Sequence, residues 1–314
     1  MSDFSCQLKK EGQARCQEIE LSVQKLISAG GKRLRPLLIL LAARFGENES
    51  VNKEKLIKIA VGVELLHMAT LVHDDIIDGA TLRRGTEAVC TQLGNKKALL
   101  VGDFLLHRAH AQLSGRLSER TEEKLHLLEQ NLCMAEIKQL SNRNRLNISC
   151  RDYLARVRRK TALFFAFCTY TGGYESGVRT RKLSYLYNLG LKMGMAFQIR
   201  DDLLDFISEN HRRGKDTGLD LANGEITLPI ILLLKTEKYG PEVKQIINRE
   251  EEKKNIGKSD CQRLRKFLQQ SGCQLIMENF IDDYLSRARE NLHNLPCLPV
   301  RSELAKLINR LSLK

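Results

Sequence analysis

The stretch KLIKIAVGVELLHMATLVHDDIIDGATLRRG (55–85) joins a long apolar segment to three aspartates and then to two arginines. In its apolar part, Ile59, Val63 and Leu66 recur at spacings of three or four residues, and the other faces are also largely apolar. Such a pattern is typical of an α-helix that is buried on all sides. We therefore expect this helix at the centre of the protein.

The rest of the chain repeats the helical pattern. Three further stretches are apolar all round: ALLVGDFLLHRAH (98–110), TALFFAFCTYTGG (161–173) and LSYLYNLGLKMGMAFQIRDDLLDF (183–206). No proline occurs between Pro36 and Pro229, which permits long helices because proline interrupts helical hydrogen bonding. No segment alternates cleanly enough for a half-buried strand. The sequence predicts an all-α fold in a single domain, 1–314, with the charged stretch 248–267 as a solvated helical hairpin.

Composition narrows the class of protein. With 42% hydrophobic and 28% charged residues, and no apolar run of about 18 residues that could span a membrane, we expect a cytoplasmic protein. Nine cysteines without a CxxC pair predict neither a disulfide framework nor a zinc site. The net charge of +13 indicates an anionic partner: nucleic acid, a membrane surface or phosphorylated small molecules. Few aromatics (5%) and no tryptophan disfavour nucleic acid.

The acidic motif at the end of the central helix opposes helix stability. Asp74 and Asp78 are four residues apart, so their carboxylates lie on one face, with Cβ atoms about 6 Å apart. Carboxylates at the C-terminal end of a helix also meet the negative end of its dipole. A single DDxxD motif can arise from capping or surface aspartates, so by itself it is weak support for a metal site.

A second DDxxD motif changes that interpretation. QIRDDLLDF carries Asp201, Asp202 and Asp205, again at the end of an apolar helix, and follows the first motif by 127 residues (201 minus 74). Two such helices can face each other across one cavity. Aspartate oxygens without histidine or cysteine ligands favour Mg²⁺, which binds few carboxylates and bridges readily to phosphate oxygens. The two motifs together predict several Mg²⁺ ions and a diphosphate ligand.

Lysines and arginines near glycines and the acidic motifs would bind diphosphate directly. In GGKRLRP (30–36), the paired glycines free the backbone, Lys32 and Arg35 share one face, and Pro36 lies in the first turn of the next helix. Arginine matches phosphate oxygens in bidentate fashion. Each cation alone is more simply an exposed charge, but together they describe two anion sites. The other cations of this set are Arg83, Arg84, Lys160 and Lys215.

These motifs, in this order, resemble those of the trans-polyprenyl diphosphate synthases: GGKRLRP, ELLHMATLVHDDIIDGATLRRG, GDFLL, RRKTALFF, FQIRDDLLDF and GKDTGLDLANGEITLP. The resemblance covers roughly residues 28–310 and implies an isoprenoid-synthase helical bundle around a central apolar cavity. RRKTAL and NLPCLPVRSELAKLI resemble in particular the larger subunit of the two-component heptaprenyl diphosphate synthases. That narrower resemblance implies a product used for menaquinone side chains.

The resemblance assigns a role to each motif. Mg²⁺ on the allylic diphosphate would be held by the aspartates of both motifs, Asp74, Asp75, Asp78, Asp201, Asp202 and Asp205. Arg83 would contact that same substrate, and Lys215 would reach the leaving diphosphate. The developing allylic cation would be flanked by Lys160, Thr161 and Gln198.

The second substrate, isopentenyl diphosphate, would be held by Lys32, Arg35, His67 and Arg84. A lone histidine on an apolar helix is usually a core residue, but His67 lies about two turns before Asp74 and can face the same cavity. Glu225 is a departure, since the family often has a lysine in this segment. We expect the change to weaken one diphosphate contact without abolishing activity.

The implied reaction ionises an allylic diphosphate, such as farnesyl diphosphate, and condenses it with isopentenyl diphosphate to give a medium- or long-chain all-trans polyprenyl diphosphate. Three alternatives remain: a terpene cyclase, which needs no second-substrate site; a non-catalytic subunit, which should lose its acidic motifs; and a geranylgeranyl diphosphate synthase. The family implies a homodimer or a heteromer with a smaller subunit. A long product also implies transient membrane contact on release.

Product length would be set by residues below the first acidic motif. Ala69 and Thr70 are small and lie roughly one turn before the aspartates, which would leave room for a growing chain. Leu132 and Cys133 would lie near the floor of the tunnel. The alternative for Ala69 is that it allows close helix packing.

Overall fold

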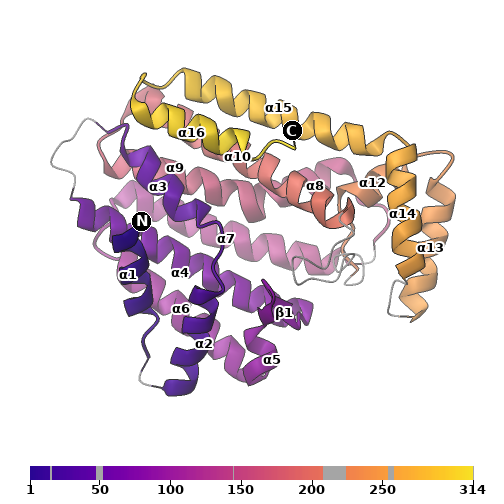
Figure 1. The fold of residues 1–314 in the computed structure, drawn as a ribbon, viewed down its shortest axis with the longest axis horizontal. Helices are drawn as coiled ribbons and strands as arrows, with labels where there is room; N and C mark the ends of the chain where they lie inside the picture. The colour runs from indigo at the N-terminus through magenta and orange to yellow at the C-terminus, as the bar shows by residue number, and fades with distance from the viewer. Residues whose placement is uncertain (15, 47–51, 144, 208–223, 254–257, 314) are drawn as a thin grey trace. The chain divides into compact units, whose positions relative to one another are not determined.

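The structure, a computed structural model, describes residues 1–314 apart from 15, 47–51, 144, 208–223, 254–257 and 314 (Figure 1). The described residues are almost entirely helical, which confirms the predicted all-α fold. In chain order the elements are α1 (Ser2–Glu11), α2 (Gln17–Ser28), α3 (Leu34–Ala43), α4 (Lys53–Asp78), β1 (Leu82–Arg83), β2 (Thr86–Glu87), α5 (Val89–Leu93), α6 (Asn95–Leu113), α7 (Glu119–Ser141), α8 (Cys150–Val157), the π-helical turn η1 (Arg158–Ala162), α9 (Leu163–Glu175), α10 (Thr180–Ile207), α12 (Leu228–Leu234), α13 (Gly240–Lys253), α14 (Lys258–Gln270), α15 (Cys273–His293) and α16 (Pro299–Asn309).

The chain forms two compact units. Among the described residues, the first comprises 1–124 and 168–184, and the second comprises 125–167, 185–207 and the chain from 224 onward. The GGKRLRP segment and the first acidic motif lie in the first unit, whereas RRKTAL and the second acidic motif lie in the second. The predicted site residues therefore fall into one group in each unit.

Helix α4 is the core of the first unit, as its all-round apolarity predicts. It begins where the Asn52 side chain accepts hydrogen bonds from the backbone of Glu54 and Lys55, and it ends at Asp78, followed by Gly79 with φ 62°. By its length and composition α4 could span a membrane. This was not expected from the sequence, because it has no uninterrupted apolar run of about 18 residues. However, 67% of its apolar window is buried inside the unit, as expected for a core helix.

Glycine allows α4 and α6 to approach closely. A Cβ atom on Gly62 of α4 would lie 2.7 Å from Leu113, and one on Gly102 of α6 would lie 2.1 Å from the His73 ring. Both distances are too short for a real Cβ contact. Gly62 and His73 therefore define the side of α4 that faces α6.

A short β-hairpin follows the first acidic motif, and sequence periodicity missed it. Strands β1 and β2 pair antiparallel with Arg83 opposite Thr86, and the two residues between them, Arg84 and Gly85, have φ values of 54° and 79°. Positive φ at both central residues is the geometry of a type I′ turn, which matches the twist of a hairpin. Two-residue strands are too short to show an alternating pattern, so only the turn residues Arg84 and Gly85 could have indicated the hairpin.

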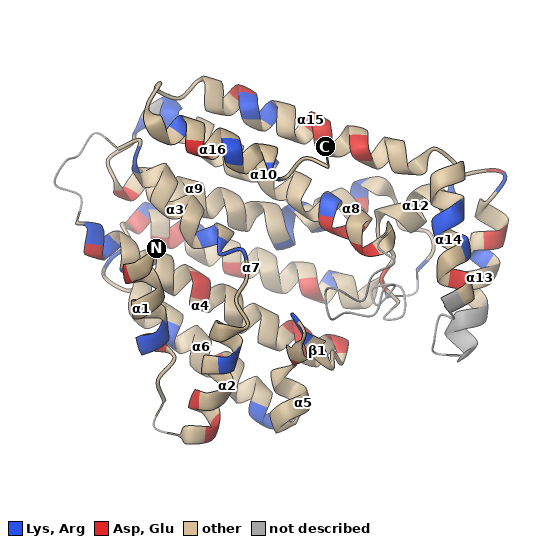
Figure 2. Cartoon of the chain, in the orientation of Figure 1, with Lys and Arg blue, Asp and Glu red and all other residues tan. Residues whose placement is uncertain are grey.

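The charged stretch 248–267 falls on α13 and α14 of the second unit, which confirms the predicted helical hairpin in its described part. Lysines and arginines are spread over many helices among the residues drawn (Figure 2). Over the described part of the chain, the positive charge is thus not concentrated in one element. This distribution is unlike the continuous basic stripe of a nucleic-acid-binding protein.

Candidate active site

The three aspartates of the first motif do not share one environment. Asp75 is 2% exposed, and its two carboxylate oxygens accept hydrogen bonds from Arg83 Nε at 2.9 and 3.1 Å, with a further ion pair to Arg83 Nη2. Burial opposes the charge of Arg83, yet its bonds to Asp75 raise the pKa of the guanidinium above its usual value. Metal binding by Asp75 stays a prediction; in this structure its carboxylate faces the hairpin and pairs with Arg83, since successive helical side chains diverge by about 100°.

Asp74 and Asp78 are the other predicted metal ligands of this motif. Both are half-buried in the last turn of α4, on one face of the helix at i and i+4. Arg83, predicted to contact the allylic substrate, lies beside them, and its side chain is 18% exposed. Its contact with Asp75 orients the hairpin against the end of α4.

The loop before α3 is anchored on α4 by a buried ion pair that sequence analysis missed. Arg33 has φ 45° and donates from Nη1 to Glu64 Oε1 at 2.5 Å and from Nη2 to the Ile27 carbonyl at 2.7 Å. Glu64 is 3% exposed. A carboxylate in a buried apolar helix requires a buried cation, so Glu64 was the signal that could have revealed this contact.

The two arginine-rich segments of the first unit meet at a glycine. Arg84 Nη1 donates to the carbonyl oxygen of Gly30, and a Cβ atom on Gly31 would lie 2.6 Å from the same nitrogen. Gly31, with φ 141°, thus leaves space for the guanidinium. Lys32 is exposed and precedes α3, so it does not share a helix face with Arg35 as predicted.

His67 lies within this group of cations. It is half-buried on α4, and burial, followed by the charges of Arg35, Arg84, Arg83 and Arg33, lowers the pKa of its imidazole well below the usual value. His67 is therefore neutral at neutral pH. The structure brings Arg35, Arg84 and His67 together as the sequence predicts, and the repulsion between the two guanidinium groups favours the binding of an anion.

The second unit presents Lys160 and Thr161 on the π-helical turn η1. Lys160 Nζ pairs with Glu136 Oε2 at 2.6 Å and donates to Gln139 Oε1 at 3.4 Å. The amide nitrogen of Gln139 in turn donates to Glu225. Wide π-turns in helices occur often at functional sites, and Glu225 contributes here by holding a neighbour of Lys160.

In the second acidic motif, as in the first, the middle aspartate has a different environment from the outer two. Its middle residue, Asp202, is 7% exposed and accepts hydrogen bonds from the Tyr153 hydroxyl at 2.6 Å and from Gln198 Nε2 at 2.8 Å. Asp201 and Asp205 are half-buried. Asp202 was also predicted to bind metal, and in this structure protein donors contact both of its oxygens.

The outer aspartates of the two motifs form two pairs of candidate metal ligands. Among the described residues, no three His, Cys, Asp or Glu side chains form a ready-made metal cluster. The first and last aspartates of each motif supply only hard oxygen donors, which fit Mg²⁺ shared with phosphate oxygens. Lys215 was predicted to contact the leaving diphosphate and lies outside the described residues.

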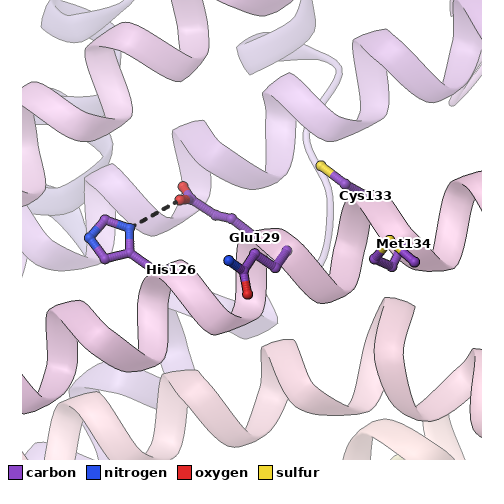
Figure 3. A pocket seen from close by; sticks show the side chains of 5 residues that line it. His126, Glu129, Cys133 and Met134 are labelled. Carbon is purple, nitrogen blue, oxygen red and sulfur yellow. Dashed lines mark ion pairs between the residues drawn. The ribbon is translucent and has the colours of Figure 1, made fainter.

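The residues predicted to set product length have mixed surroundings. Ala69 is 2% exposed, and Thr70 is half-buried with its hydroxyl donating to the His67 carbonyl at 2.8 Å. Leu132 is half-buried and Cys133 is exposed, and their place near a tunnel floor stays a prediction. Cys133 lines an open pocket along α7 (Figure 3), together with His126, Glu129, Gln130 and Met134.

Comparison with known proteins shows the family of the chain. Residues 16–264 match the family model of the polyprenyl synthetases. The chain belongs to the polyprenyl synthetase family. This synthase is therefore a prenyltransferase, a trans-polyprenyl diphosphate synthase.

Two relatives and one solved structure show how similar the synthase is to individual proteins. Heptaprenyl diphosphate synthase component 2 of Geobacillus stearothermophilus is 40% identical over 68% of the synthase and 66% of the relative, slightly under two thirds of its length. The same component of Bacillus subtilis is 35% identical over 90% of the synthase and 78% of the relative. The crystal structure of a polyprenyl synthase from Caulobacter crescentus, complexed with calcium and isoprenyl diphosphate, is 32% identical, with a TM-score of 0.92 over 99% of the synthase and 93% of that chain.

Proposed function

We propose that the synthase condenses isopentenyl diphosphate with farnesyl diphosphate in a Mg²⁺-dependent reaction. The product would be a medium- or long-chain all-trans polyprenyl diphosphate, with heptaprenyl diphosphate for menaquinone favoured by the component 2 relatives, and the enzyme would work in the cytoplasm. One observation carries the proposal: each acidic motif closes an apolar helix with its outer aspartates on one face, and in both motifs the middle aspartate is held by protein donors. Paired carboxylates at two helix ends support two sites for Mg²⁺.

The allylic substrate would be ionised beside the acidic motifs. Asp74 with Asp78, and Asp201 with Asp205, would hold Mg²⁺, which when bound stabilises negative charge on the departing diphosphate. Lys160 adds a positive charge on η1, and its pairing with Glu136 orients it. Thr161 and Gln198 present polar atoms at the same turn and would flank the allylic cation. Catalysis would then rest on electrostatics and positioning.

Isopentenyl diphosphate would bind at the cation group of the first unit. Arg35 and Arg84 supply charge, and neutral His67 donates a hydrogen bond without adding to the repulsion. No described residue of the motifs is an obvious strong base. The released diphosphate is the candidate acceptor for the proton lost in the final elimination.

Product analysis would test this function. The purified synthase is incubated with farnesyl diphosphate, labelled isopentenyl diphosphate and Mg²⁺, and the dephosphorylated products are sized by chromatography. Labelled chains longer than geranylgeranyl are expected. Geranylgeranyl alone would favour the short-chain alternative, and label-free hydrocarbons would indicate a terpene cyclase. A complete lack of turnover, even with a smaller subunit added, would indicate a non-catalytic protein.

Arg35→Ala is expected to separate the two substrates. Loss of a charge-assisted contact costs about 1.5–3 kcal/mol, so the KM for isopentenyl diphosphate should rise about 10- to 100-fold. The KM for farnesyl diphosphate should stay within about threefold of the wild-type value, and it serves as the internal control. Steady-state kinetics with each substrate varied in turn measures both. Equal rises would show that the two sites are wrongly divided.

An exposed apolar stripe on α7 supports binding of a second subunit. Leu127, Met134 and Ile137 are 56%, 57% and 57% exposed and lie on one face at heptad-like spacing. Large exposed apolar patches mark protein interfaces. The component 2 relatives are by name parts of a larger enzyme. We therefore place a homodimer or heteromer contact on this stripe.

Ile137→Asp is expected to weaken that assembly. A buried charge without a partner disfavours association, so sedimentation should show a lower mass with unchanged helical circular dichroism. Ile276→Asp is the matched control, since Ile276 is 44% exposed on α15. A wild-type monomer activated by a smaller synthase subunit would select the heteromer. A monomer with full activity alone would reject both assemblies.

A further inference from the structure

A continuous chain of four side chains in the second unit links η1 to the second acidic motif. Thr161 Oγ1 donates to Gln198 Oε1 at 2.7 Å, Gln198 Nε2 donates to Asp202 Oδ1 at 2.8 Å, and the Tyr153 hydroxyl donates to Asp202 Oδ2 at 2.6 Å. Thr161, Asp202 and Tyr153 are 6%, 7% and 1% exposed. The chain therefore lies largely out of water, where each member depends on the others.

The chemistry of the groups sets the direction of every bond. An ionised carboxylate only accepts hydrogen bonds, so Asp202 requires the amide nitrogen of Gln198. The Gln198 oxygen is then turned toward Thr161, whose hydroxyl proton is committed to it. Tyr153 occupies the other oxygen of Asp202 and thereby fixes the rotation of the carboxylate. A change at Tyr153 is therefore transmitted through Asp202 to Gln198 and Thr161.

Local structure holds each end of the chain in place. Helix α8 begins with a capping box in which Ser149 Oγ accepts from the Asp152 backbone at 3.1 Å, and Tyr153 follows in the first turn. On α10, a Cβ atom on Gly194 would lie 2.6 Å from Ala162 Cα. Gly194 therefore lets α10 approach η1 closely enough for Gln198, one turn later, to reach Thr161.

We infer that Tyr153 is a positioning residue for the second acidic motif. Through Asp202 it holds the last turns of α10, and so orients the carboxylates of Asp201 and Asp205 toward a divalent cation. Through Gln198 it also sets the hydroxyl of Thr161. The inference rests on the proposed function, since it assigns Tyr153 a role in that same metal and diphosphate site.

Tyr153→Phe tests the inference because it removes the hydroxyl and keeps the buried ring. Partners behind metal ligands typically contribute about 10- to 100-fold to metal affinity or activity. Binding of Mn²⁺ in the presence of inorganic diphosphate, followed by the paramagnetic resonance of free Mn²⁺, should weaken by this factor. The kcat should fall in the same range, while the KM for isopentenyl diphosphate stays unchanged. Tyr239→Phe is the matched control, because that hydroxyl donates to Gln270 in the same unit.

A double-mutant cycle separates positioning from simple packing. In an Asp202→Asn background, Tyr153→Phe should add less than about threefold, since residues coupled through one bond are not additive. Full additivity, or wild-type Mn²⁺ affinity in Tyr153→Phe, would overturn the inference. If instead the wild-type protein failed to retain Mn²⁺ with diphosphate, or Asp201→Ala retained it equally well, the proposed function itself would be wrong.

Discussion

Asp201→Ala is expected to lower kcat about a thousand-fold or more while the helical fold stays intact. Loss of a group that stabilises charge in the transition state costs on the order of 4 kcal/mol. Asp74→Ala should behave alike in the first motif. Turnover at saturating substrates and Mg²⁺ measures the effect. Near-normal activity in either variant would contradict the metal assignment.

The middle aspartates supply a contrast within the same experiment. Asp75→Ala leaves Arg83 buried without its partner, and breaking a buried ion pair costs about 3–5 kcal/mol of folding free energy. Asp74→Ala removes a carboxylate that repels the helix dipole and Asp78, so its Tm should be unchanged or higher. Thermal melting of the metal-free proteins separates the two roles. Asp283→Ala is a control, since this aspartate of α15 forms an exposed ion pair with Arg287.

Thr70→Phe is expected to shorten the product while leaving the rate of the first condensation intact. Thr70 lies four residues before Asp74, so its side chain is on the face of α4 that carries Asp74 and Asp78. A phenylalanine there would block the growing chain without touching the carboxylates. With farnesyl diphosphate as primer, the product should drop from about C30 or longer to about C20, as judged by chromatography after dephosphorylation.

Ala69→Phe is the matched variant, and the structure changes its expected outcome. Ala69 is seven residues after Gly62 and four before His73, which places it on the α6-facing side of α4. A phenylalanine at this buried position would overpack the contact and cost roughly 1–3 kcal/mol. We therefore expect a lower Tm and an unchanged product. A stable Ala69→Phe protein that makes a short product would show that Ala69 sets the product length after all.

The helices, their acidic ends and the family could be predicted from the sequence alone, because each shows a local regularity. Apolar spacing predicted α4 and α10, and both Asp-rich motifs stand in the last turns of those helices. Cations predicted near one another, Arg35, Arg84 and His67, were also brought together. These features depend on spacing over a few residues or on motif order, and both are readable along the chain.

Only tertiary structure decided which protein groups pair with the aspartates of each motif. In DDxxD the middle aspartates look identical to their neighbours, yet Asp75 is occupied by Arg83 and Asp202 by Tyr153, whose hydroxyl comes from 49 residues away. The same holds for the pairing of Arg33 with Glu64 and for the packing side of Ala69. Burial and hydrogen-bond partners depend on which distant element packs against a residue, and helical periodicity carries no information about that choice.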